Sequence, residues 1–111
     1  MQQSPIFTKT YDFLLWIGQH VARFPKSERF RLAQRIEHSA YAFYDQILMA
    51  ARHSEQRHER LTCADDELAR LRVYLRLAKD HGFSSMRQYQ HASGRVVEIG
   101  KLLGGWLKTV A

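Results

Sequence analysis

The sequence predicts an all-α protein that folds as an antiparallel, up-down four-helix bundle. Four stretches repeat apolar residues every three or four positions, the period that places side chains on one face of a helix. Short breaks containing Pro, Ser or Gly separate these stretches, and short connections favour antiparallel neighbours. No stretch alternates apolar and polar residues as a strand would.

The first predicted helix begins at Ser4-Pro5, because serine can cap a helix and proline fits its first position. It ends before Pro25. Its expected core stripe consists of Phe7, Tyr11, Leu14, Gly18 and Val21. Further apolar side chains flank this stripe, namely Phe13, Leu15, Trp16 and Ile17. More than half of the helix circumference is therefore apolar, which predicts more than one packing partner.

The second predicted helix runs from Glu28 to about Arg52, with Ser27 as its cap. Its expected core stripe consists of Ala33, Ile36, Ala40, Phe43, Ile47 and Ala50, and three further side chains are expected to widen it, namely Tyr41, Tyr44 and Leu48. Its first half carries four basic side chains, namely Arg29, Arg31, Arg35 and His38. The helix macrodipole disfavours positive charge near this end. Either these side chains form a binding site, or they are solvated arginines whose stems cover apolar surface.

The third predicted helix runs from about Glu55 to Asp80, after a turn near Ser54, and Gly82 supplies its closing residue. Its expected core stripe consists of Leu61, Ala64, Leu68, Leu71, Leu75 and Ala78. Arg72, Arg76 and Lys79 follow the same spacing beside this stripe. One helix therefore combines a core face with a basic face.

The fourth predicted helix begins after Ser84, which is expected to cap it. Its expected core stripe consists of Tyr89, Ala92, Val96, Ile99, Leu103 and Trp106. Gly104-Gly105 is expected to loosen the last turn or to permit another backbone to approach closely.

The length of 111 residues predicts a single domain over residues 1–111 that can bury its own core. Cys63 is the only cysteine, which excludes an internal disulfide and fits a reducing compartment. No apolar run reaches the roughly 18 residues of a membrane span, and no secretory signal opens the sequence. We therefore expect a cytoplasmic protein without membrane contact.

Basic residues outnumber acidic ones by 17 to 11, which gives a formal net charge of +6, and 12 of the 17 are arginine. The planar guanidinium binds phosphate with two hydrogen bonds and stacks on bases, so this excess favours a nucleic-acid partner. The alternative is that arginine is simply a good helix former in a helical protein.

Arg72, Arg76 and Lys79 are the strongest candidates for such contact. A spacing of i, i+4 and i+7 gives a row about 10 Å long, which matches two or three backbone phosphates. The alternative is pairing within the helix with Asp65, Glu67 and Asp80.

Other kinds of site have little support in the sequence. His53 and His58 are five residues apart, whereas helical metal ligands need a separation of three or four. Nothing predicts a basic neighbour for Cys63, and no glycine-flanked serine elbow or phosphate-binding loop occurs. We expect no metal, cofactor, small-molecule substrate or enzymatic activity.

Four segments are distinctive beyond their helical pattern, since such a pattern alone does not require Gly-Gly-Trp or paired arginines. They are IFTKTYDFLLWI (Ile6 to Ile17), FPKSERFRLAQRI (Phe24 to Ile36), LARLRVYLRLAKDHG (Leu68 to Gly82) and EIGKLLGGWLK (Glu98 to Lys108). Together they closely resemble the accessory variability determinant (Avd) proteins of diversity-generating retroelements. The most telling matches are I-G-x-x-L-G-G-W and L-R-x-x-L-R. The wider superfamily of four-helix bundles includes the ribosomal-RNA intervening-sequence proteins.

This resemblance implies a homopentameric barrel of four-helix bundles with a basic surface. It implies binding to the element's reverse transcriptase and template RNA, with DNA as a further candidate, in support of mutagenic cDNA synthesis and retrohoming. It implies no catalysis by the chain itself. The L-R-x-x-L-R arginines correspond to Arg72 and Arg76, whereas the segment with Arg29, Arg31 and Arg35 is less distinctive. The alternative function is a self-assembling helical scaffold or protein-interaction module that binds no nucleic acid.

Overall fold

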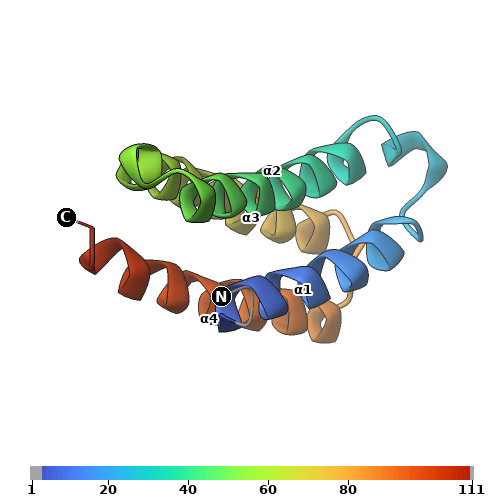
Figure 1. The fold of residues 1–111 in the computed structure, drawn as a ribbon. Coiled ribbons are helices and arrows are strands. Elements are labelled where there is room, and N and C mark those ends of the chain that lie inside the picture. Colours follow the sequence, from blue (N-terminus) through green and yellow to red (C-terminus); the bar gives the residue numbers. More distant parts are fainter. Residues whose placement is uncertain (1–3, 111) are drawn as a thin grey trace.

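Four long α-helices follow one another in the computed structural model, which describes residues 4–110 (Figure 1). They are α1 (Pro5–Val21), α2 (Leu32–Arg52), α3 (Arg57–Asp80) and α4 (Met86–Lys108). Two short 3-10 helices, η1 (Lys26–Glu28) and η2 (Ser54–Gln56), lie in the connections. The described residues contain no strand, so the predicted all-α class is confirmed.

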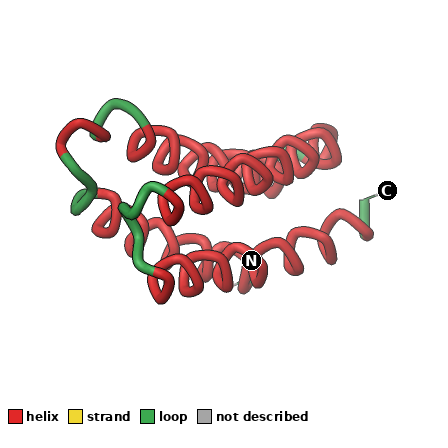
Figure 2. Tube along the Cα trace, turned by 180° about the vertical axis from the view of Figure 1, so that it is seen from behind, coloured by secondary structure: helices red, strands yellow, loops and turns green. Residues whose placement is uncertain are grey.

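The four helices form two layers, with α2 and α3 in one and α1 and α4 in the other (Figure 1). Each helix packs on the next along the chain, and α1 also packs on α4, which closes the bundle. Figure 2 shows the α1–α2 and α3–α4 connections at one end, which we call the loop end, and the α2–α3 connection at the other. This is the up-down arrangement that the short connections predicted. None of the helices within residues 4–110 is long and apolar enough to cross a membrane.

The core stripes predicted for α2 and α3 are buried at every position. Of the three side chains expected to widen the α2 stripe, Tyr44 is half-buried, whereas Tyr41 and Leu48 are exposed. On α4, Ala92, Val96, Ile99 and Leu103 are buried, while Tyr89 and Trp106 are half-buried at the edges of the stripe. On these three helices the i, i+3, i+4 spacing identifies one buried stripe, although further apolar side chains, among them Tyr41, Val73 and Val97, are exposed outside it.

The core stripe predicted for α1 is out of phase. Tyr11 is 55% exposed, and Phe7 and Gly18 are only half-buried, although Leu14 and Val21 are buried as expected. The buried face also includes Ile6, Thr10, Phe13, Ile17 and His20. Because apolar residues cover more than half of this helix, its period allows two stripes one residue apart, and packing selects between them. Thr10 and His20 are polar, so a search for apolar residues at helical spacing does not find these two buried positions.

Two predicted helix starts are too early. Helix α2 begins at Leu32 and not at Glu28, because Pro25 leads into η1, and Ser27 lies in η1 without capping α2. The N–H of Leu32 instead donates to Oε1 of Glu28 at 3.4 Å. Helix α3 begins at Arg57 and not at Glu55, because the turn predicted near Ser54 takes the form of η2.

The predicted cap of α4 is wrong by one residue. Ser85, and not Ser84, caps the helix, since its Oγ accepts from the N–H of Gln88 at 3.1 Å while its own N–H donates to Oε1 of Gln88 at 2.8 Å. Ser84 is buried instead. At the preceding turn Gly82 has φ 82°, so glycine closes α3 in the left-handed conformation as predicted.

Helix α4 continues through Gly104-Gly105 to Lys108, so the predicted loosening of its last turn is not seen. At either glycine a Cβ would have no described atom within 4 Å apart from the neighbouring backbone of α4 itself, so no other backbone approaches closely there. The last turns of α4 extend beyond the start of α1, as Figures 1 and 2 both show.

Candidate nucleic-acid interface

The basic row of Arg72, Arg76 and Lys79 runs along the seam between α3 and α4. Arg72 and Arg76 are exposed, and Lys79 is half-buried. A Cβ at Gly100 of α4 would lie 3.0 Å from Nη2 of Arg72, so the Arg72 side chain reaches across to α4. The Nζ of Lys79 lies 4.9 Å from the ring centre of Tyr89, also on α4. Helix α4 therefore supports two of the three cations from the side.

Acidic neighbours engage only the C-terminal end of the basic row. Arg76 Nε lies 3.9 Å from Asp80 Oδ2, and Lys79 Nζ lies 3.4 Å from Asp80 Oδ1. Within residues 4–110 Arg72 forms no ion pair or hydrogen bond, and neither Asp65 nor Glu67 pairs with the row. Exposed pairs of this kind contribute about 0–1 kcal/mol, so a phosphate can displace them. Pairing with acidic residues of the same helix, the alternative to nucleic-acid binding, therefore holds for Arg76 and Lys79 but not for Arg72.

The other predicted arginines do not form one cluster. Arg29 and Arg31 precede α2, and Arg35 lies in its first turn. Arg29 lies at a hollow between α1 and α2 that Lys26 and Glu37 also line. Arg31 and Arg35 instead line a groove between α2 and α3. The predicted group is therefore divided between two sides of α2.

Arg35 is held against α3 by an aromatic contact. Its Nη1 donates to Oη of Tyr74 at 3.5 Å, and its guanidinium carbon lies 6.0 Å from the centre of the Tyr74 ring. Arg31 is freer, because its side chain is 76% exposed and its Nε is 4.0 Å from Glu28 Oε2. These two cations and Tyr74 form a basic, aromatic surface on the α2 side of α3.

Sequence reasoning missed Tyr74 and two further residues beside this surface, Arg70 and Phe30. Arg70 pairs with Glu67, with 3.0 Å between Nη1 and Oε2, and lines the same side of α3 as Tyr74. Its separation of two residues from Arg72 places it on another side of the helix, which the search for a single row ignored. Phe30, in the connection before α2, is 76% exposed. The sequence contains one sign that Phe30 belongs to a binding surface: it lies between two arginines and outside the core stripe of α2.

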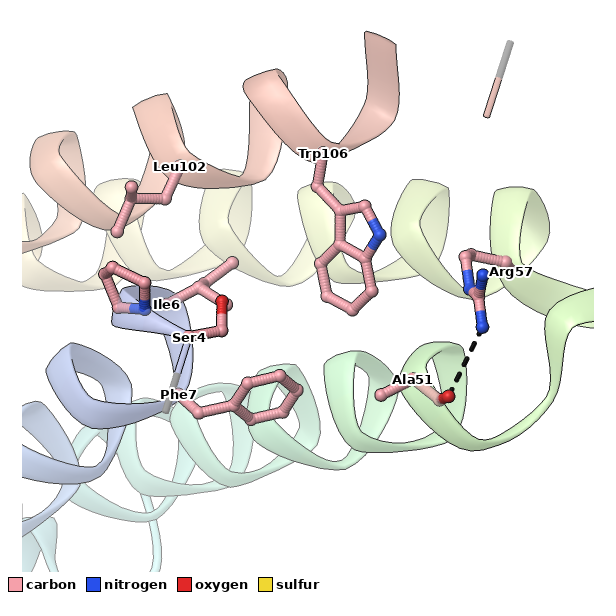
Figure 3. Close-up of a pocket in the computed structure, with 8 residues that line it drawn as sticks. Ser4, Ile6, Phe7, Ala51, Arg57, Leu102 and Trp106 are labelled. Atoms are coloured by element: carbon pink, nitrogen blue, oxygen red, sulfur yellow. Dashed lines mark hydrogen bonds between the residues drawn. The ribbon is translucent and has the colours of Figure 1, made fainter. Parts of the chain in front are cut away.

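A separate pocket of 340 Å³ lies where α4 extends past α1 (Figure 3). Phe7 and Trp106 both line it and contact each other edge-on, with ring centres 6.1 Å apart. Arg57, the cation in its lining, donates to the carbonyls of Ala50 at 2.7 Å and Ala51 at 3.3 Å. This arginine therefore caps the end of α2, and the pocket is mainly an apolar surface.

His20 is a titratable side chain buried within the described residues. It is 5% exposed, its Nε2 lies 2.7 Å from Oγ of Ser84, and the Trp16 ring stacks on it at 4.8 Å. Burial lowers the pKa of His20, and the nearby positive charge of Arg23 lowers it further. The contact joins α1 to the α3–α4 connection at the loop end.

The residues considered for metal binding and nucleophilic chemistry are not gathered into a site. His53 is half-buried beside η2, His58 is exposed on α3, and Cys63 is a half-buried free thiol. Over residues 4–110 no three His, Cys, Asp or Glu side chains are placed to hold a metal ion.

The chain was compared with known proteins. A family model described as bAvd-like matches residues 5–110. No curated protein matches the sequence.

Proposed function

This chain belongs to the bAvd-like family, and from that premise we propose that it is a non-catalytic accessory subunit of a diversity-generating retroelement. In this role it binds the element's reverse transcriptase and template RNA in the cytoplasm and supports mutagenic cDNA synthesis and retrohoming. DNA is a further partner. The family match agrees with the resemblance of four segments to Avd proteins.

The observation that carries the nucleic-acid part of the proposal is the basic row on α3. Arg72 and Arg76 are exposed, Arg72 has no acidic partner within residues 4–110, and α4 holds Arg72 and Lys79 at the seam. Two or three backbone phosphates fit a row of about 10 Å. Contacts of this kind bind any sequence, because the phosphate backbone is common to all of them.

Assembly strengthens such contacts. We propose a homopentamer, in which five chains of formal charge +6 carry five times that charge, roughly +30. Exposed apolar side chains on α1 and α2 support an interface between copies, since Tyr11, Leu15 and Tyr41 are each more than half exposed. A long RNA can then contact several basic rows at once.

The proposal is tested by measuring RNA affinity over a range of salt concentrations. Replacing both Arg72 and Arg76 by Ala should weaken binding and flatten the slope of log affinity against log salt. The slope should fall by about 0.7 to 0.9 for each phosphate that a chain no longer neutralises. The matched control is Arg52→Ala/Arg87→Ala, which removes the same charge from two exposed positions outside the row. Light scattering and circular dichroism check that mass and helicity are unchanged.

Equal slopes for the row variant and the control variant would show that the row does not contact phosphate. A changed mass would instead assign these arginines to an interface between copies. The alternative function, a scaffold without nucleic-acid binding, is favoured by the exposed apolar side chains of α1. It predicts that the wild-type chain assembles but does not bind RNA even at low salt.

A further inference from the structure

Phe30 is the most exposed large apolar side chain in the described part of the chain, at 76%. It lies between η1 and the start of α2, outside the core stripe that α2 buries. The other rings near this end of the bundle are packed, since Phe24 and Phe83 contact each other with centres 5.5 Å apart. The fold therefore has no evident structural use for the Phe30 ring.

Phe30 lies at the edge of a groove of about 460 Å³ between α2 and α3. Tyr74 and Leu77 of α3 provide its apolar side, and Arg31, Arg35 and His81 provide positive or titratable groups. The groove continues past Arg35 and Tyr74, which also line an adjoining hollow with His38 and Arg70. The Phe30 ring thus lines a groove whose other lining residues include Arg31 and Arg35, and Arg70 lines the adjoining hollow.

The carboxylates along this path are mostly shielded from solvent. Glu28 accepts a hydrogen bond from the Leu32 N–H at 3.4 Å, and its side chain is 12% exposed. Glu67 binds Arg70 through Oε2 at 3.0 Å, its Oε1 is buried without a hydrogen-bond partner among the described residues, and its side chain is 18% exposed. By contrast, the side chain of Arg31 is 76% exposed and that of Arg70 is 53% exposed. The charge that the groove presents to solvent is therefore mainly positive.

We propose that this groove binds single-stranded nucleic acid, with one unpaired base stacked on Phe30 and the adjoining phosphates on Arg31 and Arg35. Base stacking on an exposed ring requires a base whose face is free, which a duplex does not offer along its length. Cations that follow the ring then hold the backbone. The proposal rests on the proposed function and adds to it a site that distinguishes single strands from duplexes. The basic row on α3 contacts phosphate alone and makes no such distinction.

The test compares the binding of two probes by the full chain. One is a fluorescently labelled oligoadenylate of about 12 nucleotides, within the range of single-strand sites, and the other is an RNA duplex of equal length. Phe30→Ala and Phe30→Leu should weaken oligoadenylate binding about tenfold and leave duplex binding unchanged. Phe30→Trp should retain oligoadenylate binding, because indole also stacks on bases.

Met86→Ala is the matched control, because Met86 is also an exposed large apolar side chain, at 56%, but lies at the start of α4. It should change neither affinity. Because Phe30 is exposed, its replacement should leave the melting temperature and the mass of the assembly as they are.

The outcomes separate this proposal from the proposed function. If Phe30→Ala binds oligoadenylate as well as wild type while Arg72→Ala/Arg76→Ala weakens both probes, the stacking site is wrong and the nucleic-acid function stands. If Phe30→Leu binds like wild type, the ring makes only an apolar contact, and stacking is wrong. A changed mass would assign Phe30 to a protein interface and overturn the site. If wild type binds neither probe, the proposed function fails, and the stacking site fails with it.

Discussion

His20 is a titratable ring buried among the side chains of the bundle, next to the buried Ser84. Its hydrogen bond to Ser84 and its stacking on Trp16 both fit a neutral imidazole, and burial lowers its pKa below the ordinary value of 6.5. In the unfolded chain the same ring takes up a proton near pH 6.5. Below that pH the unfolded state therefore binds more protons than the folded state, so acid favours unfolding.

The first prediction concerns the pH dependence of folding stability, because the unfolded chain takes up a proton on His20 more readily than the folded chain does. The free energy of unfolding should fall as the pH decreases from about 7.5 through 6.5 to about 5.5. The replacement His20→Gln, which cannot titrate but can still bond to Ser84, should reduce this pH dependence. Urea melts of both proteins at several pH values measure it. An exposed histidine, His91, provides the control as His91→Gln. Equal pH dependence in all three proteins would place the titrating group elsewhere.

At the scale of the helix, the seam between α3 and α4 links stability to the candidate site. Gly100 lies in the middle of α4, where glycine costs about 0.5–1 kcal/mol relative to alanine. A Cβ there would meet Nη2 of Arg72 at 3.0 Å, and this is the far end of a flexible side chain. An alanine at Gly100 would therefore stabilise α4, but the Arg72 side chain would have to move away from its Cβ.

Gly100→Ala should therefore raise the free energy of unfolding by up to about 1 kcal/mol and lower RNA affinity. Gly94→Ala is the matched control, because a Cβ at Gly94 has no atom within 4 Å among the described residues. It should stabilise α4 without affecting RNA binding. Denaturant melts and the salt titration measure the two effects. If the two variants bind RNA equally, the position of Arg72 does not matter for binding.

The helices were predictable from sequence where the i, i+3, i+4 spacing of apolar residues identified one stripe. The six-position stripes of α2 and α3 are buried at every position, although apolar side chains beside them are exposed, namely Tyr41 and Leu48 on α2 and Val73 and Leu77 on α3. The stripe of α1 was not predictable, since its period has two solutions and only contact with α2 and α4 selects one. Ser84 and Ser85 are adjacent and equally able to cap a helix, so the choice between them depends on which one reaches His20.

The candidate site was predictable in part for a similar reason. The spacing of Arg72, Arg76 and Lys79 places them on one side of a helix, and Arg72 and Arg76 are exposed as expected. Their support by α4 depends on the absence of a side chain at Gly100, which is a contact between helices. The groove beside Phe30 joins residues more than 40 positions apart, from η1 to the end of α3, so local patterning could not reveal it.

At the scale of the whole molecule, the bundle measures 42 × 24 × 21 Å and leaves apolar side chains on its surface. Tyr11 is 55% exposed and Leu15 is 57% exposed on α1, and Tyr41 is 52% exposed on α2. Single exposed apolar residues are common in monomers, but several on adjacent helices favour an interface. On α3, Val73 is 57% exposed and Leu77 is 41% exposed. An interface through α1 and α2 would leave the basic row on α3 available in an assembly.

The proposed pentamer predicts a mass of about 65 kDa, five times 13.1 kDa, by light scattering at micromolar concentration. Leu15→Lys should shift this mass toward the monomer while helicity is retained, because the substituted side chain is exposed in the single chain. A wild-type mass of 13 kDa would rule out the pentamer. A Leu15→Lys protein with unchanged mass would move the interface away from this part of α1.

The hydrogen bond between His20 and Ser84 also affects the order in which the chain folds. It joins residues 64 positions apart, so it forms only after α1 has docked beside the α3–α4 connection. Closing so long a loop costs more entropy than pairing α2 with α3, which neighbour each other in sequence. The contact should therefore be absent from the folding transition state, so that it lowers the unfolding rate without changing the folding rate. In denaturant kinetics, removing it with Ser84→Ala should speed the decay of the native state by raising the unfolding rate, with the folding rate nearly unchanged.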